Sequence, residues 1–177
     1  MKVEIERKFL VQPSKLPVNL FQRWEKLSQG YLSRSPVVRA RWVELPEGAE
    51  GHSAGAPGAE KGRQPSLTHS KGYLTIKGLG MISRNEFEYP IPAEDAQALL
   101  ALCGHRLEKT RYFWPAGKHM WEVDRFHGRL EGLWIAEIEL GAEDEAFERP
   151  DWLGPEVTGD SRYANANLAE TGEPPGR

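Results

Sequence analysis

The stretch Glu4-Ile5-Glu6-Arg7-Lys8 places a charged side chain at every second position of a segment, Val3–Val11, that alternates like a β-strand. In a strand, residues i and i+2 point to the same side of the sheet and lie about 6–7 Å apart. Glu4, Glu6 and Lys8 therefore share one face of this predicted strand. The N-terminal segment predicts a strand with one strongly charged face.

The same spacing of charges recurs in four later segments. The repeated pairs and triplets are Arg39 and Arg41, then Arg84, Glu86 and Glu88, then Glu122 and Asp124, then Glu137 and Glu139. One interpretation is that each charged face is the solvated side of an ordinary antiparallel sheet. However, like charges side by side on a sheet repel each other, and an ordinary surface mixes signs to avoid this. We therefore expect the charged faces to line the inside of a curled sheet.

The coarse pattern of secondary structure indicates an antiparallel α+β fold that can close into a barrel. Strands are predicted at 3–11, 28–33, 37–44, 73–79, 84–91, 105–114, 118–126 and 133–140. Helices are predicted at Pro13–Leu27, Pro92–Cys103, Ala142–Arg149 and Tyr163–Glu170, and Trp152–Gly159 is either irregular or a last short strand. The helices Pro13–Leu27 and Pro92–Cys103 are expected to cover apolar faces of the sheet.

The length of 177 residues and the absence of a fixed repeat predict one domain, at residues 1–170. Within it, residues 46–72 are rich in Gly, Pro, Ala and Ser, so they are predicted to form a flexible loop insertion. Residues 171–177 are rich in Pro and Gly, and we expect them to be a frayed tail.

Composition argues against several classes of protein. Lys and Arg number 23 against 26 Asp and Glu, a net charge of −3, which argues against nucleic-acid binding. No apolar run is long enough for a membrane helix, and the charged N-terminus is unlike a signal peptide, so a cytoplasmic location is predicted. The single cysteine, Cys103, excludes an internal disulfide and a multi-cysteine zinc site.

The charges themselves indicate the chemistry. Buried charges must be paired, hydrated or bound to metal, and carboxylates without cysteine favour Mg²⁺ or Mn²⁺. The cationic side chains need an anion, and their number suits a triphosphate better than a single phosphate. This cationic set is Lys8, Arg39, Arg41, Lys77 and Arg111. A metal–carboxylate cluster facing Arg and Lys is the arrangement that phosphoryl transfer requires.

The residues in order resemble the CYTH superfamily, the triphosphate tunnel metalloenzymes. Glu4-Ile5-Glu6-Arg7-Lys8 matches the E-x-E-x-K signature, and the resemblance is closest to short bacterial inorganic tripolyphosphatases. Further matching segments are 29–32, 39–41, 74–77, 83–89, 108–112, 122–124, 136–140 and 157–163. The resemblance implies an eight-stranded antiparallel β-barrel that forms a tunnel, with a few flanking helices.

The resemblance also assigns roles to the charged residues. The metal ligands it implies are Glu4, Glu6, Glu88, Asp124, Glu137 and Glu139, with Glu86 and Glu122 as further members of the acidic side. The triphosphate-binding residues it implies are Arg39, Arg41, Lys77, Arg84 and Arg111, with Arg162, near the C-terminal end of the chain, as a further candidate. Lys8 and Tyr31 would form a catalytic dyad, in which the ammonium lowers the phenol pKa. Tyr31 could instead be structural, and Arg7 and Lys109 are expected to face solvent.

We therefore expect a divalent-metal-dependent enzyme that hydrolyses a triphosphate, with inorganic tripolyphosphate as the leading substrate. Thiamine triphosphatase, nucleoside triphosphatase and adenylate cyclase remain alternatives on the same fold. A non-catalytic polyphosphate-binding module is the alternative outside enzymes. The expected partner is a small molecule that contains a triphosphate, neither nucleic acid nor a membrane, and a homodimer is left open.

Overall fold

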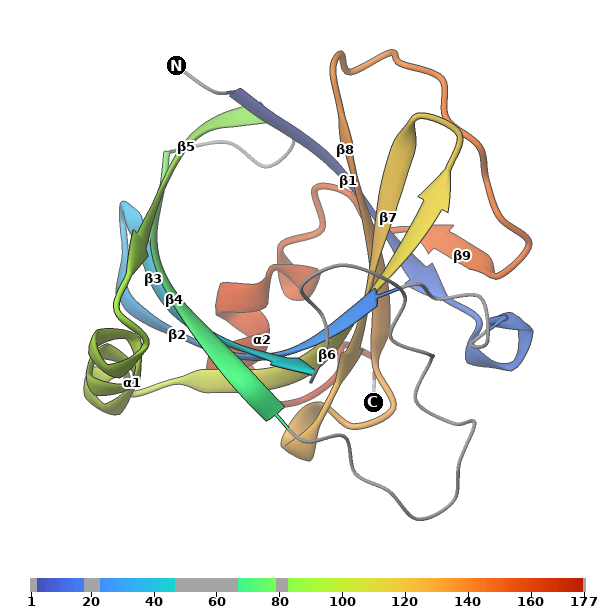
Figure 1. The fold of residues 1–177 in the computed structure, drawn as a ribbon. Helices are drawn as coiled ribbons and strands as arrows, with labels where there is room; N and C mark the ends of the chain where they lie inside the picture. The colour runs from blue at the N-terminus through green and yellow to red at the C-terminus, as the bar shows by residue number, and fades with distance from the viewer. Residues whose placement is uncertain (1–2, 18–22, 47–66, 79–82, 177) are drawn as a thin grey trace.

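The computed structural model describes residues 3–17, 23–46, 67–78 and 83–176, and its main element is an antiparallel sheet (Figure 1). The strands are β1 (Val3–Val11), β2 (Arg23–Arg34), β3 (Val37–Pro46), β4 (Leu67–Lys77), β5 (Ser83–Ile91), β6 (Arg106–Ala116), β7 (His119–Phe126), β8 (Trp134–Leu140) and β9 (Leu153–Glu156). The helices are α1 (Ala93–Leu102) and α2 (Asn165–Thr171), with 3-10 turns η1 (Pro13–Lys15), η3 (Gly128–Leu130) and η4 (Ser161–Tyr163).

The strands follow the order β5-β4-β3-β2-β6-β7-β8-β1-β9, and β5 also pairs with β1. In this last pairing Val3 lies opposite Asn85, and Ile5 lies opposite Ser83. Each of the strands β1 to β8 therefore pairs with two other strands of this set, and the sheet curls strongly (Figure 1). The described residues contain the eight predicted strands and a ninth, β9, which pairs with β1 and confirms the short-strand alternative for Trp152–Gly159.

The register places several charges of opposite sign directly across from each other, whereas Glu6–Glu139 and Glu122–Glu137 are pairs of like charge. Lys8 on β1 lies opposite Glu137 on β8, and Lys77 on β4 lies opposite Glu86 on β5. Arg111 on β6 faces Asp124 on β7. Cross-strand pairs of opposite charge stabilise a sheet, whereas like charges at the same positions destabilise it. The alternation in the sequence therefore becomes, on one face of the sheet, both pairs of opposite charge and opposed pairs of carboxylates.

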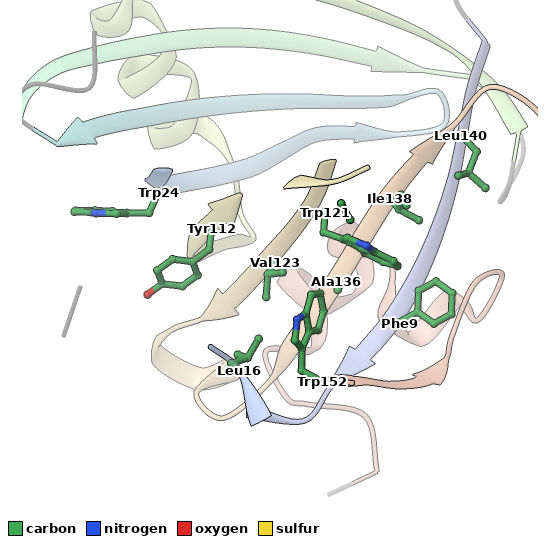
Figure 2. Close-up of a cluster of buried hydrophobic side chains, with 11 residues drawn as sticks. Phe9, Leu16, Trp24, Tyr112, Trp121, Val123, Ala136, Ile138, Leu140 and Trp152 are labelled. Atoms are coloured by element: carbon green, nitrogen blue, oxygen red, sulfur yellow. The ribbon is translucent and has the colours of Figure 1, made fainter. Parts of the chain in front are cut away.

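The other face of β6, β7, β8 and β1 carries an aromatic core (Figure 2). Phe9 and Trp121 are fully buried, and their ring centroids lie 5.6 Å apart in an edge-to-face contact. Trp152 contacts Trp121 in the same way, at 5.7 Å. Each large side chain buried in this manner contributes roughly 1.5–3 kcal/mol. Because side chains alternate along a strand, this packing fixes Lys8 and Glu122, which are neighbours in sequence of Phe9 and Trp121, on the opposite face.

Helix α1 confirms the helix predicted at Pro92–Cys103 and packs against β4, β3 and β2. Glu94 and Asp95 lie in its first turn, where negative charge is favourable. The contact with β4 is close: a Cβ on Gly72 would lie 2.7 Å from the Pro92 carbonyl oxygen and 2.8 Å from the Ala96 Cβ. Helix α2 likewise confirms the small helix predicted at Tyr163–Glu170.

The predicted helix Pro13–Leu27 is wrong where the structure describes it. Only Pro13–Lys15 forms a 3-10 turn, and residues from Arg23 onward belong to β2; residues 18–22 lie outside the described part. Trp24 and Leu27 are three residues apart, which is a helical spacing, yet they pack into different apolar clusters. In a strand, this spacing places side chains on opposite faces, so apolar cover on both faces of β2 explains the pattern.

Two further predictions are corrected. The segment Ala142–Arg149 is not a helix but turns and irregular chain. The predicted loop 46–72 is too wide, because Pro46 ends β3 and Leu67 begins β4, while residues 47–66 lie outside the described part. The domain bounds at 1–170 and the frayed tail remain predictions. Neither described helix has the length and apolar character needed to cross a membrane.

Candidate active site

A cavity of about 630 Å³ is lined by the charged face of the sheet. It brings together most of the predicted site residues, namely Glu6, Lys8, Tyr31, Arg39, Arg41, Lys77, Glu88, Arg111, Glu137 and Glu139. Glu86 and Glu122 also line it. The side chains of Glu4 and Arg84 lie outside the described residues, although their backbones pair with each other between β1 and β5. All eight strands from β1 to β8 thus contribute polar side chains to one cavity.

Glu137 is the centre of one charged cluster. Lys8 donates to its carboxylate at 2.8 Å, and Arg111 Nη2 donates to it at 2.9 Å. Burial acts to raise the pKa of Glu137, but the charges of Lys8, Lys109 and Arg111 outweigh burial and hold the pKa well below its ordinary value. Glu137 is therefore a carboxylate at neutral pH, although only 6% of the residue is exposed.

Asp124 is buried behind the charged cluster around Glu137 and does not line the cavity. Arg111 donates to both of its oxygens, from Nε and Nη2, at 2.7 Å in each case. This two-bond geometry fixes the plane of the guanidinium as well as its position. Asp124, predicted as a metal ligand, is placed by the structure where it orients Arg111.

Lys109 is buried, and the expectation that it faces solvent is wrong. Only 2% of the residue is exposed, and its Nζ donates to Asp124 Oδ2 at 2.5 Å. Burial lowers the pKa of Lys109 to about 8, against the opposing effect of the Asp124 charge. A signal was present in the sequence, because Lys109 and Arg111 are two residues apart, the same spacing that marked Arg39 and Arg41.

A second charged cluster joins β3, β4 and β5. Arg41 Nη2 donates to Glu88 Oε2 at 2.8 Å, and Arg39 Nη2 donates to Thr75 Oγ1 at 3.0 Å and to Glu88 at 3.3 Å. Burial, reinforced by the charge of Arg39, lowers the pKa of Arg41 to about 10. The Nε atoms of Arg39 and Arg41 are both buried without a hydrogen-bond partner among the described residues. One carboxylate thus serves two guanidinium groups, whose donors are not all satisfied.

Lys77 completes this side of the cavity. Its Nζ lies 2.5 Å from Glu86 Oε2, and both side chains are largely buried. Arg7, by contrast, pairs with Glu156 outside the cavity, with 29% of its side chain exposed, as expected for a residue that faces solvent. Arg162 pairs with Asp160 and does not line the cavity, so it is not brought to the site.

Tyr31 lines the cavity, but its acidity differs from the prediction. Burial raises its pKa, and the nearby charges of Arg39 and Lys8 offset this only in part. The Lys8 ammonium does act to lower the Tyr31 pKa, as predicted, but the effect of burial is larger and the net pKa is raised. Gln29 Nε2 donates to the Tyr31 hydroxyl at 2.9 Å, so the hydroxyl hydrogen is free to point elsewhere.

Three polar residues of the cavity lining were missed by sequence reasoning. They are Lys118, in the turn between β6 and β7, His119, the first residue of β7, and Asn165, at the start of α2. In the predicted strand 118–126, Met120 separates Lys118 from the charged pair Glu122 and Asp124, and His119 alternates out of step with that pair. Asn165 begins a helix, so charge alternation in strands finds none of the three. Recognising them requires the folded arrangement of the chain.

The acidic side of the cavity has the donor chemistry of a hard divalent cation. Glu6 and Glu139 lie directly opposite each other on β1 and β8, and Glu137 follows on the same face. Oxygen donors of this kind fit Mg²⁺ or Mn²⁺. Within the described residues, no group of three or more His, Cys, Asp and Glu side chains already lies close enough to hold a metal ion. The carboxylates of Glu6 and Glu137 instead contact the Lys8 ammonium, at 3.6 and 2.8 Å.

Comparison with known proteins gives consistent matches. The CYTH domain family model matches residues 63–171. An inorganic triphosphatase of Acetivibrio thermocellus is 48% identical over 114 residues, which cover 63% of this chain and 73% of the relative. An inorganic triphosphatase of Nitrosomonas europaea is 42% identical over 102 residues, covering 55% and 67%. A solved structure of an inorganic triphosphatase covers 94% of this chain and 97% of its own, with 31% identity and a TM-score of 0.58.

Proposed function

The chain belongs to the CYTH domain family, and on this premise we propose that it hydrolyses inorganic triphosphate inside the charged cavity. The single observation that carries the proposal is the wall formed by Arg39, Arg41 and Lys77. There, two guanidinium groups share the carboxylate of Glu88 and retain unsatisfied Nε donors. A buried donor without a partner is costly, so the wall is suited to a polyanion that supplies many acceptor oxygens.

The proposed chamber is a closed eight-stranded tunnel made of β1 to β8. The double-sided pairing of each of these strands supports this proposal, with β5–β1 as the closing contact. A tunnel holds an extended phosphate chain between walls of opposite sign, which also limits access of bulk water.

The acidic side would hold Mg²⁺ or Mn²⁺ through Glu6, Glu137 and Glu139, together with Glu4 of the same sequence signature. When bound, the metal would neutralise phosphate charge and make a water molecule more nucleophilic. The other predicted ligands, Glu88 and Asp124, are engaged by arginines, and we assign them the role of orienting Arg41 and Arg111. The proposed metal site thus uses fewer carboxylates than the sequence predicts as metal ligands.

The residues of the chain divide the remaining work. Arg39, Arg41, Lys77 and Arg111 bind the phosphate oxygens and stabilise the charge that develops on the leaving pyrophosphate. Lys8, held by Glu137 and Glu6, contributes a fixed ammonium beside the reacting phosphorus. Tyr31 keeps its proton because its pKa is raised, so it positions the attacking water as a hydrogen-bonding hydroxyl. Water attacks the terminal phosphorus, the bridging P–O bond breaks, and orthophosphate and pyrophosphate leave.

The lining of the cavity favours inorganic triphosphate over triphosphates that carry an organic group. Its apolar side chains are small or aliphatic, namely Val37, Met120, Leu140, Ala164 and Ala166. Aromatic rings are limited to Tyr31 and His119 among the described lining residues. An adenine or thiazolium ring needs an apolar or stacking surface, and such side chains are outnumbered by charged ones in the described lining. The cytoplasmic location, the absence of nucleic-acid and membrane partners, and the homodimer all remain predictions.

The test is a phosphate-release assay with tripolyphosphate, thiamine triphosphate, ATP and pyrophosphate, each with Mg²⁺ or Mn²⁺, and with cyclic AMP measured in parallel. We expect tripolyphosphate to give the highest kcat/KM. Glu137→Gln should lower that value by about 100-fold or more, because it removes a proposed metal ligand and the partner of Lys8. Tyr31→Phe should lower kcat by about 10- to 100-fold.

The matched control is Glu156→Gln, the same change at a carboxylate that pairs with Arg7 outside the cavity. It should retain the wild-type kcat/KM. Full activity of Glu137→Gln, or a preference for ATP with production of cyclic AMP, would contradict the proposal. Tight binding of polyphosphate without any phosphate release would instead support the non-catalytic alternative.

A further inference from the structure

The carboxylate of Glu145 is held at one end of the cavity by three different hydrogen-bond donors. His119 Nε2 lies 3.0 Å from Oε1, and the Lys118 ammonium pairs with the same oxygen. The backbone N–H of Gly141 donates to Oε2 at 2.5 Å. Lys118 lies in the β6–β7 turn and His119 begins β7, while Gly141 follows β8, so the three donors converge from two separate segments.

The donors line the cavity, but the carboxylate that they hold does not. Lys118, His119 and Gly141 share the cavity lining with Lys8 and Arg39, whereas Glu145 is absent from it. The Lys118 side chain is 73% exposed and that of His119 is 10% exposed, which places this group of donors at the rim. In Figure 1 the β6–β7 hairpin lies beside the end of β8, at the top of the view.

The donors suit an oxyanion. An ammonium, an imidazole and a backbone N–H are groups that commonly bind phosphate oxygens. Their effect on the present anion is strong, since hydrogen bonds from Lys118, Gly141 and His119 lower the pKa of Glu145 to about 2. Glu145 follows a turn at residues 143–144 and begins a stretch of irregular chain up to residue 150, outside any strand or helix. Its movement therefore breaks no sheet pairing.

A phosphate group can replace this carboxylate on chemical grounds. It carries more oxygens and more negative charge than a carboxylate, so it can satisfy all three donors at once. It would reach them from the cavity, where the proposed substrate and product reside. The chain thus supplies a weaker internal anion at a place where a stronger external anion passes.

We propose that Lys118, His119 and the Gly141 N–H form a second phosphate-binding site at the rim of the cavity, which Glu145 occupies as an internal anion until a phosphate group displaces it. The inference rests on the proposed function for the source of that phosphate group. The source is either the orthophosphate product or the distal group of an inorganic polyphosphate chain longer than three units.

The binding test follows the ring resonances of His119 by NMR during a titration with orthophosphate in EDTA, so that it does not depend on hydrolysis. In Glu145→Gln, which lacks the internal anion, the apparent Kd should fall by about tenfold. Lys118→Ala should raise it by a similar factor. The control Glu148→Gln, an exposed carboxylate in the same segment, should match the wild type.

Kinetic arms distinguish the two sources. If the rim binds the distal group of a long chain, Glu145→Gln lowers the KM for tetrapolyphosphate. If it binds product, Glu145→Gln strengthens inhibition of tripolyphosphate hydrolysis by orthophosphate. The inference is overturned if Glu145→Gln and Lys118→Ala both behave like Glu148→Gln in the NMR titration, in which case Glu145 only links two segments. Absence of tripolyphosphate hydrolysis by the wild type would refute the proposed function, and the NMR titration with orthophosphate would still test the rim site.

Discussion

Replacement of Asp124 by Asn removes one negative charge from the most deeply buried part of the charged wall. The carboxylate accepts a hydrogen bond from Lys109 at 2.5 Å and two from Arg111 at 2.7 Å. Its side chain is only 1% exposed, so water cannot take its place. An asparagine keeps one acceptor oxygen and turns an N–H₂ group toward a cation. Lys109 and Arg111 would then be buried with a surplus of positive charge.

The expected loss of stability can be worked out from this geometry. Removing one partner of a buried ion pair costs about 3–5 kcal/mol. For a chain of this size, each kcal/mol lowers Tm by about 2–4 °C, which gives a fall of about 6–20 °C. A cost at the upper end is expected if Lys109 keeps its proton, because Asp124 is the charge that opposes the effect of burial on its pKa.

Urea unfolding and differential scanning calorimetry of the wild type and Asp124→Asn measure this cost. Asp151→Asn is the matched control, because Asp151 lies in an exposed turn and should change stability by less than about 0.5 kcal/mol. If the free energy of unfolding of Asp124→Asn lies within about 1 kcal/mol of the wild-type value, the buried ion pairs of Asp124 with Lys109 and Arg111 do not stabilise the sheet as described.

Two other changes test the fold and the buried network. Gly72→Ala should lower the free energy of unfolding by about 1–3 kcal/mol, because its Cβ would press on Pro92 and Ala96 of the α1 contact; Gly104→Ala, with nothing within 4 Å, should cost far less in the same urea titration. Burial lowers the Lys109 pKa to about 8, whereas an unfolded lysine keeps its proton to about 10.5. Between these two pH values the unfolded state binds more protons, so the free energy of unfolding of the wild type should rise with pH relative to that of Lys109→Met. A difference in unfolding free energy that does not change with pH would show that the Lys109 pKa is not lowered in the folded protein.

Much of the site follows from the sequence because charge alternation in a strand translates directly into geometry. Glu137 and Glu139 line the cavity while Ala136 and Ile138 pack into the aromatic core, as period-two alternation requires. The curl of the sheet also follows, since like charges on successive strands are tolerable only when the opposite wall supplies their partners. Charge alternation along each strand therefore also indicates how the strands are arranged around the cavity.

The remaining features depend on which surfaces are covered in three dimensions. The spacing of Trp24 and Leu27 fits a helix, and only the presence of apolar clusters on both sides of β2 makes it a strand. The pKa of Tyr31 is raised by burial, which the neighbouring sequence does not reveal. The contact of His119 with Glu145 joins the start of β7 to an irregular segment 26 positions away, so no local pattern indicates it.

The measurement that tests the central claim most directly is calorimetric titration of the protein with inorganic tripolyphosphate in EDTA. We predict that one triphosphate binds per chain, and that Arg39→Gln and Arg41→Gln each weaken binding by at least about tenfold. The control Arg162→Gln should bind tripolyphosphate with the wild-type affinity. Absence of binding to the wild type, or equal binding by all three variants, would contradict the assignment of this cavity to a triphosphate.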